Sequence, residues 1–446
     1  MRLEVAGEAD VLVVGGGPSG IPAALASARS GADVLLVERD ASVGGEAARF
    51  LPFGSFHTDT GEQVVAGIAQ EIVDELVARG GSAGHLEMEG GWGARIVPFD
   101  PEALKSVAQD MLRDAGVRLL LGSLAVGVIM NRRTLRGVAI ANKGGIQLCL
   151  AKVVIDATGD ADVASYAGVA FEKGEPGIGA MQPGTLMFRI AGVDEEGVSR
   201  CFPPLAPVYG PKLGSGRSGR LHYAGDFKAW RRELEEEGFP FSPELRFWAT
   251  SIRDGELFVN AARVRDVDST DPVSLTESEI AGRELVNRIC AFLRRHVDGF
   301  QDSYLSETAT HVGIRESRRI RGEYILTASD VLTGRSFEDG IARGAYGIDI
   351  HDGKTDGGWS FQKIAEGRGY YEIPYRCLLP QTTENLLVTG RCISVTREAL
   401  GSTRIMSTCM ALGEAAGVAG ALASQGGQGV AAIDTSGLRR RLGMAD

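Results

Sequence analysis

The feature that constrains this chain most is a glycine-rich turn that follows a short apolar run near its beginning. The run Val11–Val14 carries no charge, which predicts a strand buried on both faces. Gly15, Gly17 and Gly20 follow at the G-x-G-x-x-G spacing, and residues 21–30 predict a helix. A strand, a tight turn and a helix in this order form the first half of a βαβ unit.

The spacing of these glycines has a physical cause in nucleotide binding. Gly15 allows the tight turn, Gly17 lets a pyrophosphate approach the backbone, and Gly20 lets the helix pack closely on the strand. Free backbone amides at the start of the helix face the phosphates. A second apolar run, residues 34–37, ends at Glu38, whose carboxylate can accept a hydrogen bond from a ribose hydroxyl. The sequence therefore predicts a dinucleotide-binding unit and not an isolated glycine turn.

The length, charge, and cysteine and histidine content of the chain limit the classes of function that it can have. At 446 residues the chain is long enough for two domains with separate cores. Its formal net charge of -11 argues against general attraction to nucleic acid or anionic lipid. The six cysteines and six histidines lie apart, so we expect no disulfide framework and no metal site, and a reducing cytoplasm fits. No apolar run reaches membrane-spanning length and no signal core precedes the first strand, so we expect a cytoplasmic protein without a membrane partner.

Later segments continue the same kind of fold. Residues 117–150 alternate in short apolar runs divided by polar turns, which predicts a meander of strands. Another buried strand lies within Val153–Asp160 and ends in a glycine turn, and a late one lies at residues 385–389. Helices are predicted over residues 64–76, 101–114, 229–237, 278–296 and 407–423.

The amino-acid composition changes in the middle of the chain. From about Tyr166 to Tyr375 aromatic and arginine residues become frequent and irregular segments separate the helices, which indicates a second domain inserted into the first. Within it, Thr276 followed by Glu279 predicts a capping box at a helix start. The predicted fold class is α/β, with a Rossmann-like domain of parallel sheet and β-meander and an inserted α+β domain. The expected parts are residues 1–165 and 376–446 for the nucleotide-binding domain and 166–375 for the substrate or cap domain.

Several motifs beyond the first unit make the chain recognisable. They are Gly44-Gly45, Gly313-Ile-Arg-Glu-Ser-Arg-Arg319, Ile348-Asp-Ile-His-Asp352, Ile373-Pro-Tyr-Arg376, Asn385-Leu-Leu-Val-Thr-Gly-Arg-Cys392 and Gly401-Ser-Thr-Arg-Ile-Met-Ser-Thr-Cys-Met-Ala-Leu-Gly413. With these motifs the chain resembles, over nearly its whole length, the FAD-dependent oxidoreductases related to the flavoprotein subunits of fumarate reductase and succinate dehydrogenase.

The resemblance implies that FAD is the cofactor. It places the adenine near Val126 and the isoalloxazine toward Gly390-Arg391 and the start of the C-terminal helix. A helix N-terminus carries partial positive charge, so the amides of residues 406–409 can stabilise a reduced, anionic flavin. The residues expected to contact FAD are Gly15, Gly17, Pro18, Ser19, Gly20, Glu38, Arg39, Gly44, Gly45, Glu46, Val126, Ala157, Thr158, Gly159, Gly390, Arg391, Met406, Ser407, Thr408 and Cys409.

Two arginines before the C-terminal helix bear on the reaction. In the fumarate reductase relatives a similar arginine binds a substrate carboxylate, which implies this role for Arg404, because the planar guanidinium can hold a carboxylate through two hydrogen bonds. A surface or flavin-side ion pair is the other interpretation of Arg404. Arg397 stands where many relatives have histidine. Since arginine is not a base near neutral pH, another group must move the proton, or the reaction differs.

A cluster of charges precedes these motifs. Arg315, Arg318 and Arg319 surround the single acid Glu316. The cluster is either an anion-binding wall that faces the flavin or an ion-pair network that fixes the inserted domain. We favour the network for Arg318 and Arg319 and leave both interpretations open for Arg315.

Two histidines are candidates for proton transfer or ring contact. His351 lies between Asp349 and Asp352 and is a candidate general acid or base. His57 lies soon after the Gly44-Gly45 turn and is a candidate for contact with the flavin ring. A structural role is the alternative for each histidine.

The sequence therefore predicts a flavoenzyme that transfers a hydride between flavin N5 and a small polar or anionic molecule, for example a carboxylate. One alternative is an FAD-dependent monooxygenase that uses NAD(P)H and O2, although the chain has a single convincing dinucleotide turn. Another is a non-catalytic or electron-relay subunit of a complex, although the chain has no iron-sulfur cysteine pattern of its own. An electron-transfer partner or a homo-oligomer is left open.

Overall fold

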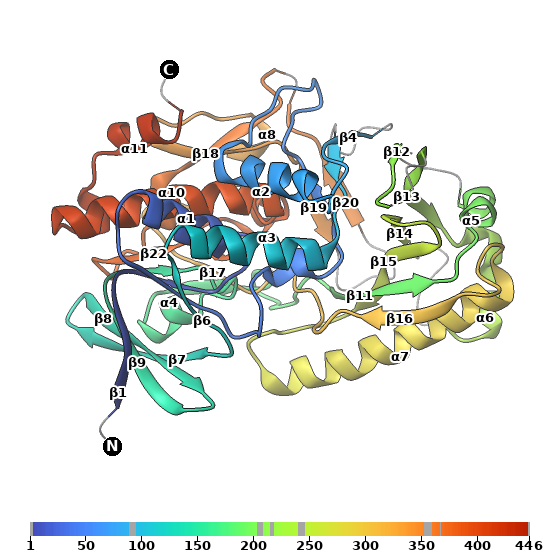
Figure 1. The fold of residues 1–446 in the computed structure, drawn as a ribbon, viewed down its shortest axis with the longest axis horizontal. Helices are drawn as coiled ribbons and strands as arrows, with labels where there is room; N and C mark the ends of the chain where they lie inside the picture. Colours follow the sequence, from blue (N-terminus) through green and yellow to red (C-terminus); the bar gives the residue numbers. More distant parts are fainter. Residues whose placement is uncertain are drawn as a thin grey trace.

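The computed structural model describes residues 3–88, 95–202, 208–214, 218–239, 246–351, 359–365 and 367–444. Two large sheets dominate these residues (Figure 1). The first sheet lies with a layer of helices in the part of the molecule that holds both ends of the chain (Figure 1). The second sheet lies on the opposite side, with one long helix running along it (Figure 1).

The first sheet joins a parallel part to an antiparallel meander. Its strands are β1 (Glu4–Val14), β2 (Val34–Val37), β6 (Arg118–Leu120), β7 (Leu124–Asn131), β8 (Thr134–Asn142), β9 (Gly145–Asp156) and β22 (Leu386–Val388). β6, β2, β1 and β9 pair in parallel in that order. β8 pairs antiparallel with the first half of β9, and β7 pairs antiparallel with β8. β22 pairs in parallel with the second half of β9, so the last strand of the chain completes the sheet.

A layer of helices covers this sheet. They are α1 (Gly20–Arg29), α2 (Gly67–Ala78), α3 (Pro101–Asp114) and α10 (Met406–Gly426). α10 can approach α1 closely because it has glycines at the contact: a Cβ at Gly413 would lie 2.0 Å from the Ser19 carbonyl oxygen, and one at Gly417 would lie 2.2 Å from the Ala23 carbonyl oxygen. α10 is the one described helix that is long and apolar enough to cross a membrane, but 83% of that apolar window is buried inside the protein, which is typical of a core helix.

The second sheet is antiparallel and carries the second core. Its strands are β11 (Gly184–Ala191), β12 (Val208–Pro211), β13 (Ser218–Asp226), β14 (Arg246–Thr250), β15 (Glu256–Val264) and β16 (Tyr304–Thr308), in the order β12-β13-β14-β15-β11-β16. The long helix α7 (Pro272–His296) packs on one face, where Leu186, Phe188 and Phe247 join the helix residues Val286 and Phe292 in one core. The other face of this sheet is turned away from α7 and contributes side chains to the cavity described below.

Shorter elements connect the two sheets and the helices. They are η1 (Gly45–Ala48), β3 (Phe53–Gly54), β4 (Leu86–Glu87), β5 (Arg95–Val97), α4 (Asp162–Tyr166), β10 (Phe171–Lys173), α5 (Glu195–Cys201), η2 (Lys228–Trp230), α6 (Arg231–Glu236), β17 (Arg318–Ile320), α8 (Ala328–Leu332), β18 (Gly340–Gly344), β19 (Ile348–His351), β20 (Trp359–Gln362), β21 (Tyr371–Pro374), η3 (Tyr375–Leu378), η4 (Gly390–Cys392), α9 (Arg397–Thr403), η5 (Val430–Ala432) and α11 (Thr435–Arg441).

One predicted helix start is wrong. The capping-box pattern at Thr276 placed the start of α7 near Ser278, but the helix begins at Pro272. Asp271 is its N-cap and accepts a hydrogen bond from the backbone N–H of Val273, and a proline at the first helical position suits a helix start. The Thr276 hydroxyl instead donates to the Pro272 carbonyl one turn earlier. Asp271-Pro272 is a second helix-start signal close to the capping box, and the helix begins at this signal.

The fold class predicted from the sequence is confirmed: a mixed α/β fold with a parallel sheet extended by a β-meander, and a further sheet with its own core. Apart from Phe50, the second core takes its buried residues from Leu186 to Val312. The division into residues 1–165, 166–375 and 376–446 stays a prediction.

Candidate active site

A cavity of about 410 Å³ lies where the two sheets face each other. It receives residues from the glycine turn after β1, from the open face of the second sheet, and from the segment that joins α9 to α10. Most of the predicted site residues line it. They are Gly15, Gly17, Pro18, Ser19, Glu38, Arg39, Gly45, Glu46, Ala157, Thr158, Gly159, Arg315, His351, Gly390, Arg391, Arg404, Met406 and Cys409.

The glycine turn has the shape that a pyrophosphate needs. A Cβ at Gly15 would lie 2.5 Å from the Ala157 carbonyl oxygen, so the turn tolerates only glycine there, while a Cβ at Gly17 would meet nothing nearer than 3.8 Å. α1 has no side-chain N-cap and no acid in its first turn, which leaves its first amides available to an anion. The Ser19 hydroxyl instead donates to the Thr389 hydroxyl oxygen at 2.8 Å. These residues fit the phosphates of FAD.

Glu38 is held in place at the end of β2. One carboxylate oxygen accepts from the Gly16 N–H at 2.6 Å, and the other accepts from the Asp40 N–H at 2.8 Å. Burial raises the pKa of Glu38 above its usual value, and these two backbone bonds only partly oppose that rise. The carboxyl group is thus fixed in orientation at the edge of the cavity, where the ribose of FAD is expected.

The N-terminus of α10 reaches the other part of the cavity. Its N-cap residue, Ile405, offers no side-chain cap, and Met406 and Cys409 of the first turn line the cavity. The buried hydroxyls of Ser407 and Thr408 have no hydrogen-bond partner among the described residues. Uncapped amides at a helix N-terminus favour negative charge, as the expected flavin position requires.

Some predicted residues do not line the cavity. Gly20 lies behind the turn, where a Cβ would meet the Gly15 carbonyl oxygen at 1.7 Å. Val126 is on β7 and is 37% exposed. Gly44, Ser407 and Thr408 are likewise absent from the cavity wall, and the cofactor roles of all these residues stay predictions.

His57 is also outside the cavity wall. Its ring is buried and packs edge-on against His85, with ring centroids 4.8 Å apart. Burial, and then the charge of Arg95, lower the pKa of His57 below its usual value. The surroundings of His57 suit a neutral packed ring, and its contact with the flavin stays a prediction.

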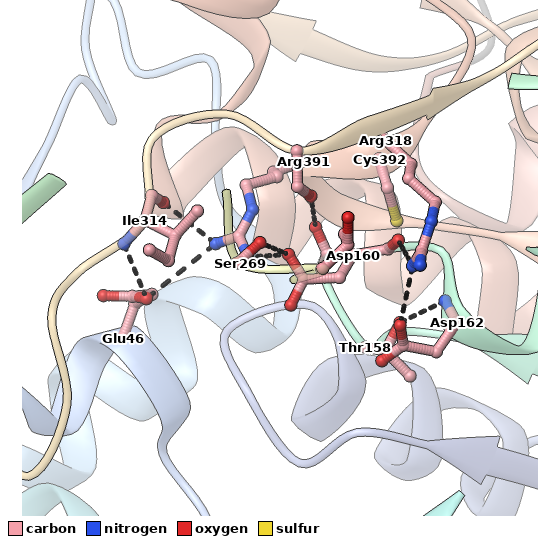
Figure 2. Close-up of polar contacts among 12 residues, drawn as sticks. Glu46, Thr158, Asp160, Asp162, Ser269, Ile314, Arg318, Arg391 and Cys392 are labelled. Atoms are coloured by element: carbon pink, nitrogen blue, oxygen red, sulfur yellow. Dashed lines mark hydrogen bonds and ion pairs between the residues drawn. The ribbon is translucent and has the colours of Figure 1, made fainter. Parts of the chain in front are cut away.

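Arg391 lines the cavity but its guanidinium is already engaged (Figure 2). One nitrogen donates to Asp160 at 2.8 Å and another to the Ile314 carbonyl at 3.1 Å, with Glu46 3.8 Å away. Burial opposes the charge, but Asp160 and Glu46 outweigh it and raise the pKa of Arg391. Arg391 therefore ties η1, the turn after β9 and the 313–319 segment together at the wall of the cavity.

Arg404 and Asp349 form the centre of the reaction end. The Arg404 guanidinium donates to the Asp349 carbonyl at 3.0 Å and to its carboxylate at 3.2 Å. The Trp359 indole N–H donates to the other carboxylate oxygen of Asp349 at 2.6 Å. His351 Nε2 lies 3.3 Å from Asp349 Oδ2. The hairpin of β19 and β20 thus presents an acid, a histidine and an indole to one arginine, while Asp352 lies outside the described residues.

The charges of this group follow from burial and from neighbouring cations. Burial would raise the pKa of Asp349, but the hydrogen bonds from His351 and Trp359 and the charge of Arg404 hold it below its usual value. Burial, and then the charge of Arg315, lower the pKa of His351 to about 3. His351 is therefore neutral near pH 7. It donates through Nε2 to Asp349, and its buried Nδ1 has no partner among the described residues.

Two more arginines face this group without an acid of their own. Arg315 donates to the Pro183 carbonyl at 2.7 Å and to the Thr185 hydroxyl at 2.8 Å. Within the described parts of the chain, neither Arg315 nor Arg263 of β15 has a carboxylate at ion-pair distance. Burial, then the charges of Arg404 and Arg263, lower the pKa of Arg315 to about 9. The three guanidinium groups therefore repel one another, which an anion among them would offset.

The neighbouring arginines form an ion-pair network, as favoured from the sequence. Arg319 donates to one oxygen of the fully buried Glu316 at 2.7 Å, and Arg397 donates to the other at 3.1 Å. Arg318 pairs with Asp162 at 2.8 Å. Arg397 thus points at Glu316 and is not in the cavity wall.

The second sheet contributes residues that the sequence did not single out. His222, Arg246, Trp248, Asn260 and Arg263 line the cavity. They come from the face of β13, β14 and β15 that is turned away from α7. The signal that could have found them is period-two alternation: in β14 the cavity residues Arg246 and Trp248 alternate with core residues. The described residues contain no cluster of three or more His, Cys, Asp or Glu that could hold a metal ion.

Comparisons with known proteins agree with this geometry. A family model described as FAD dependent oxidoreductase matches residues 10–442. Thiamine thiazole synthase of Methanococcus aeolicus is 33% identical over 166 residues, which cover 35% of this chain and 57% of that protein. The corresponding protein of Methanococcus vannielii is 29% identical over 174 residues, which cover 35% of this chain and 59% of that protein. The chain thus spans less than two thirds of the length of the curated relatives it matches.

One solved structure shows the fold. A geranylgeranyl bacteriochlorophyll reductase-like protein from Thermoplasma acidophilum superposes with a TM-score of 0.50 and 15% sequence identity. The match covers 98% of this chain and 82% of that one. At this identity the likeness concerns the fold alone.

Proposed function

This chain belongs to the family of FAD-dependent oxidoreductases, and from that premise we propose that it transfers a hydride between flavin N5 and a small anionic substrate. The proposal includes the relation to fumarate reductase and succinate dehydrogenase flavoproteins that the sequence motifs suggested. The observation that carries it is the group of Arg263, Arg315 and Arg404 in the cavity wall, where Asp349 pairs with Arg404 and, among the described residues, no carboxylate lies at ion-pair distance from Arg263 or Arg315. A group of half-buried guanidiniums whose charges are not balanced by described carboxylates is the expected setting for a carboxylate ligand.

Each residue of this group has a different role in the proposed reaction. FAD, when bound, supplies the acceptor or donor of the hydride. Arg404 and Arg263 bind the substrate anion and fix its orientation, because bidentate hydrogen bonds restrict the rotation of a carboxylate. Asp349 holds Arg404 and His351 in place and balances part of the positive charge. Arg315 adds charge without forming an ion pair among the described residues.

His351 takes or gives the proton in this proposal. Its Nε2–H is engaged by Asp349, so Nδ1 carries the lone pair that accepts a proton. Burial and the charge of Arg315 lower the pKa of His351 to about 3. A bound anion offsets the charge of Arg315 and raises the basicity of His351. The proton acceptor thus gains strength only when substrate is present.

The test measures anion binding to the FAD-loaded enzyme under argon. Acetate, succinate and benzoate are titrated while the flavin difference spectrum is recorded, and candidate substrates are screened by bleaching of the oxidised flavin band. Arg263→Met and Arg404→Met should each weaken carboxylate binding about 10- to 100-fold, the effect of removing one hydrogen-bonded charge. Arg335→Met is the control, because Arg335 pairs with Asp330 outside the cavity wall. The proposal fails if no carboxylate perturbs the flavin, or if all three variants bind alike.

A second measurement separates the electron donors. Excess NADPH is added to the same holoenzyme under argon before any other reductant. Slow or absent bleaching, followed by fast bleaching with a substrate, is the expected outcome. Fast bleaching by NADPH and peroxide release in air would instead favour a monooxygenase, and co-purification with an iron-sulfur protein would favour an electron-relay subunit.

A further inference from the structure

One tyrosine at the reaction end of the cavity has a hydroxyl group that the fold does not use. Tyr346 lines the cavity, and its ring packs edge-on against Phe361 of β20, with centroids 5.3 Å apart and an interplanar angle of 66°. Its backbone carbonyl accepts a hydrogen bond from Ser402, but within the described parts of the chain its hydroxyl has no hydrogen-bond partner. Tyrosine hydroxyls in a protein interior normally have a partner, so this group is available to a ligand.

The position of Tyr346 is fixed by α9 and the residue that follows it. The Ser402 hydroxyl donates to the Tyr346 carbonyl and accepts from the Tyr371 hydroxyl at 2.6 Å. Three residues after Tyr346, the Asp349 carbonyl accepts from the Arg404 guanidinium at 3.0 Å. The segment that carries Tyr346 and Asp349 is therefore held at both ends, which fixes the tyrosine relative to the proposed anion site.

The charges around Tyr346 keep its hydroxyl protonated. Burial, and then the charge of Asp349, raise the pKa of Tyr346 above its usual value, and the charges of Arg404 and Arg315 only partly oppose this rise. The hydroxyl thus interacts with the same acid and arginines that form the proposed substrate site. Because it stays protonated well above neutral pH, it can donate a hydrogen bond to a substrate oxygen.

The anion side of the site depends on an irregularity in β15. Between Leu186 and Phe188 the register of β11 against β15 shifts, so that one residue of β11 lies opposite two of β15. Residues three apart in a regular strand face opposite sides of the sheet, but Asn260 and Arg263 both line the cavity. The bulge thus turns Arg263 toward the cavity, and the arginine is placed by a strand of the sheet.

His351 supplies a group that complements the tyrosine. Its Nδ1 has no partner among the described residues and is a hydrogen-bond acceptor in the neutral ring, since Nε2 donates to Asp349. The site therefore offers a carboxylate-binding arginine pair, a hydroxyl donor and a nitrogen acceptor. A second oxygen on the substrate uses both of the last two groups: it accepts from Tyr346 and, as a hydroxyl, donates to His351. A plain carboxylic acid uses neither.

We propose that the substrate is a hydroxy acid, or the matching oxo acid in the reverse direction, whose carboxylate binds Arg263 and Arg404 and whose second oxygen accepts a hydrogen bond from Tyr346. The proposal rests on the function proposed above and names the substrate class of that same site. On oxidation the C–H hydrogen leaves with its electron pair as a hydride, for which bound FAD is the acceptor. The O–H proton goes to Nδ1 of His351, and a carbonyl group remains. Tyr346 keeps its own proton and stabilises the negative charge that develops on the oxygen.

The experiment compares acids that differ by one oxygen. Pyruvate and propionate form a small pair, and phenylglyoxylate and phenylacetate form a larger one. Each acid is titrated into the FAD-loaded enzyme under argon, and its dissociation constant is taken from the flavin difference spectrum. The oxo acids report binding without turnover, because their carbonyl carbon has no hydrogen to lose. In each pair that binds, the oxo acid should bind about fivefold more tightly, which corresponds to roughly 1 kcal/mol for one added hydrogen bond.

A variant of Tyr346 assigns this preference to its hydroxyl. Tyr346→Phe removes the hydroxyl and keeps the ring, so it should bring the ratio of the two dissociation constants close to one and leave propionate binding unchanged. Tyr304→Phe is the matched control and should leave the ratio unchanged, because Tyr304 is exposed on β16 outside the cavity wall.

The hydroxy acids test the reaction itself. Lactate or mandelate should bleach the oxidised flavin band under argon, whereas propionate and phenylacetate should not. Tyr346→Phe should slow this bleaching by about tenfold or more, since it removes a donor to the reacting oxygen.

The outcomes separate the two proposals. Equal binding within both pairs, with every acid weakened by Arg404→Met, overturns the hydroxy-acid assignment and leaves the anion site standing. A preference for the oxo acid that survives Tyr346→Phe overturns the role of Tyr346. If no carboxylate binds at all, the proposed function itself fails.

Discussion

At the scale of single residues, five buried or half-buried arginines divide into two groups by their partners. Arg319, Arg391 and Arg397 each have a carboxylate within hydrogen-bond distance. Arg263 and Arg315 have none among the described residues, and they line the cavity. A buried guanidinium without an acid is unfavourable unless a ligand supplies the charge. The charges of the first group are balanced within the protein, and the unbalanced second group supports the proposed anionic substrate.

The network around Glu316 gives the first prediction. Arg397→Met should lower the free energy of unfolding by about 3 kcal/mol, because it leaves the fully buried Glu316 with one cation in place of two. Arg321→Met is the control: its partner is Glu172, both side chains are exposed, and its loss should cost less than about 1 kcal/mol. Urea unfolding of both variants measures the difference. Equal losses of unfolding free energy in the two variants would mean that the buried ion pair stabilises the fold no more than the exposed one.

The buried His222 gives a prediction about pH. Its pKa is lowered to about 4, so the unfolded chain binds a proton that the folded protein excludes as pH falls from about 6.5 to 4. The free energy of unfolding should therefore fall on acidification, with His222 alone contributing about 2 kcal/mol between pH 7 and pH 5. His222→Gln, which can still bond Thr250, should reduce this loss by the same amount in urea titrations with saturating FAD. If the free energy of unfolding falls equally with pH in the wild-type protein and in His222→Gln, the prediction is contradicted.

At the scale of elements, α10 determines how the cofactor turn is built. Its glycines let it lie directly against α1, and the contact at Gly413 is made with the Ser19 backbone of the turn itself. The helix therefore supports the phosphate site from behind, while its uncapped N-terminus faces the cavity. One helix thus links FAD binding to the packing of the core.

Substitution of one glycine tests this link. Gly413→Ala should lower the free energy of unfolding by about 1–3 kcal/mol, since the new methyl group overlaps the Ser19 carbonyl by more than the gain in helix propensity can offset. The same change should weaken FAD binding, measured by fluorescence of released flavin. Gly426→Ala, at the end of α10 with no atom nearer than 3.4 Å to the new Cβ, should be neutral or slightly stabilising. If Gly413→Ala binds FAD as tightly as the wild-type protein, α10 does not support the cofactor site.

At the scale of the whole molecule, the cavity lies between two separate cores. One wall belongs to the sheet of β1 and β9, and the other to the sheet of β14 and β15. A ligand that binds the folded protein and contacts both walls stabilises the whole arrangement. We therefore expect the cofactor to stabilise the fold as well as to supply the chemistry.

Removal of FAD tests that role. The apoprotein should unfold at lower temperature than the holoenzyme, and FAD at 100 times its dissociation constant should restore about 2.7 kcal/mol of stability. Thermal unfolding at a series of FAD concentrations measures the shift, with adenosine diphosphate as a control ligand that lacks the flavin. A melting temperature that does not depend on FAD would contradict binding of FAD to the folded state.

Local patterns were enough to predict the cofactor half of this protein. The buried run of β1, the glycine spacing, Glu38 and the long apolar α10 are each set by residues a few positions apart, because strand periodicity, tight turns and helix packing depend on short-range sequence. α3 was predicted with its observed bounds for the same reason, since Asp100 and Pro101 mark its start. The start of α7 was missed where two local signals competed.

The substrate half was decided by the tertiary structure. A long stretch of chain separates Arg404 from Trp248 and Arg263, and nothing in their own segments says that they share a cavity. The antiparallel register of β14 and β15 selects which residues face the cavity, and the β19–β20 hairpin brings Asp349 to Arg404. The sequence by itself determined the strand, glycine turn and helix that we expect to hold the dinucleotide. Only the tertiary structure determined which charges and rings line one cavity, because that depends on bringing together segments far apart in the chain.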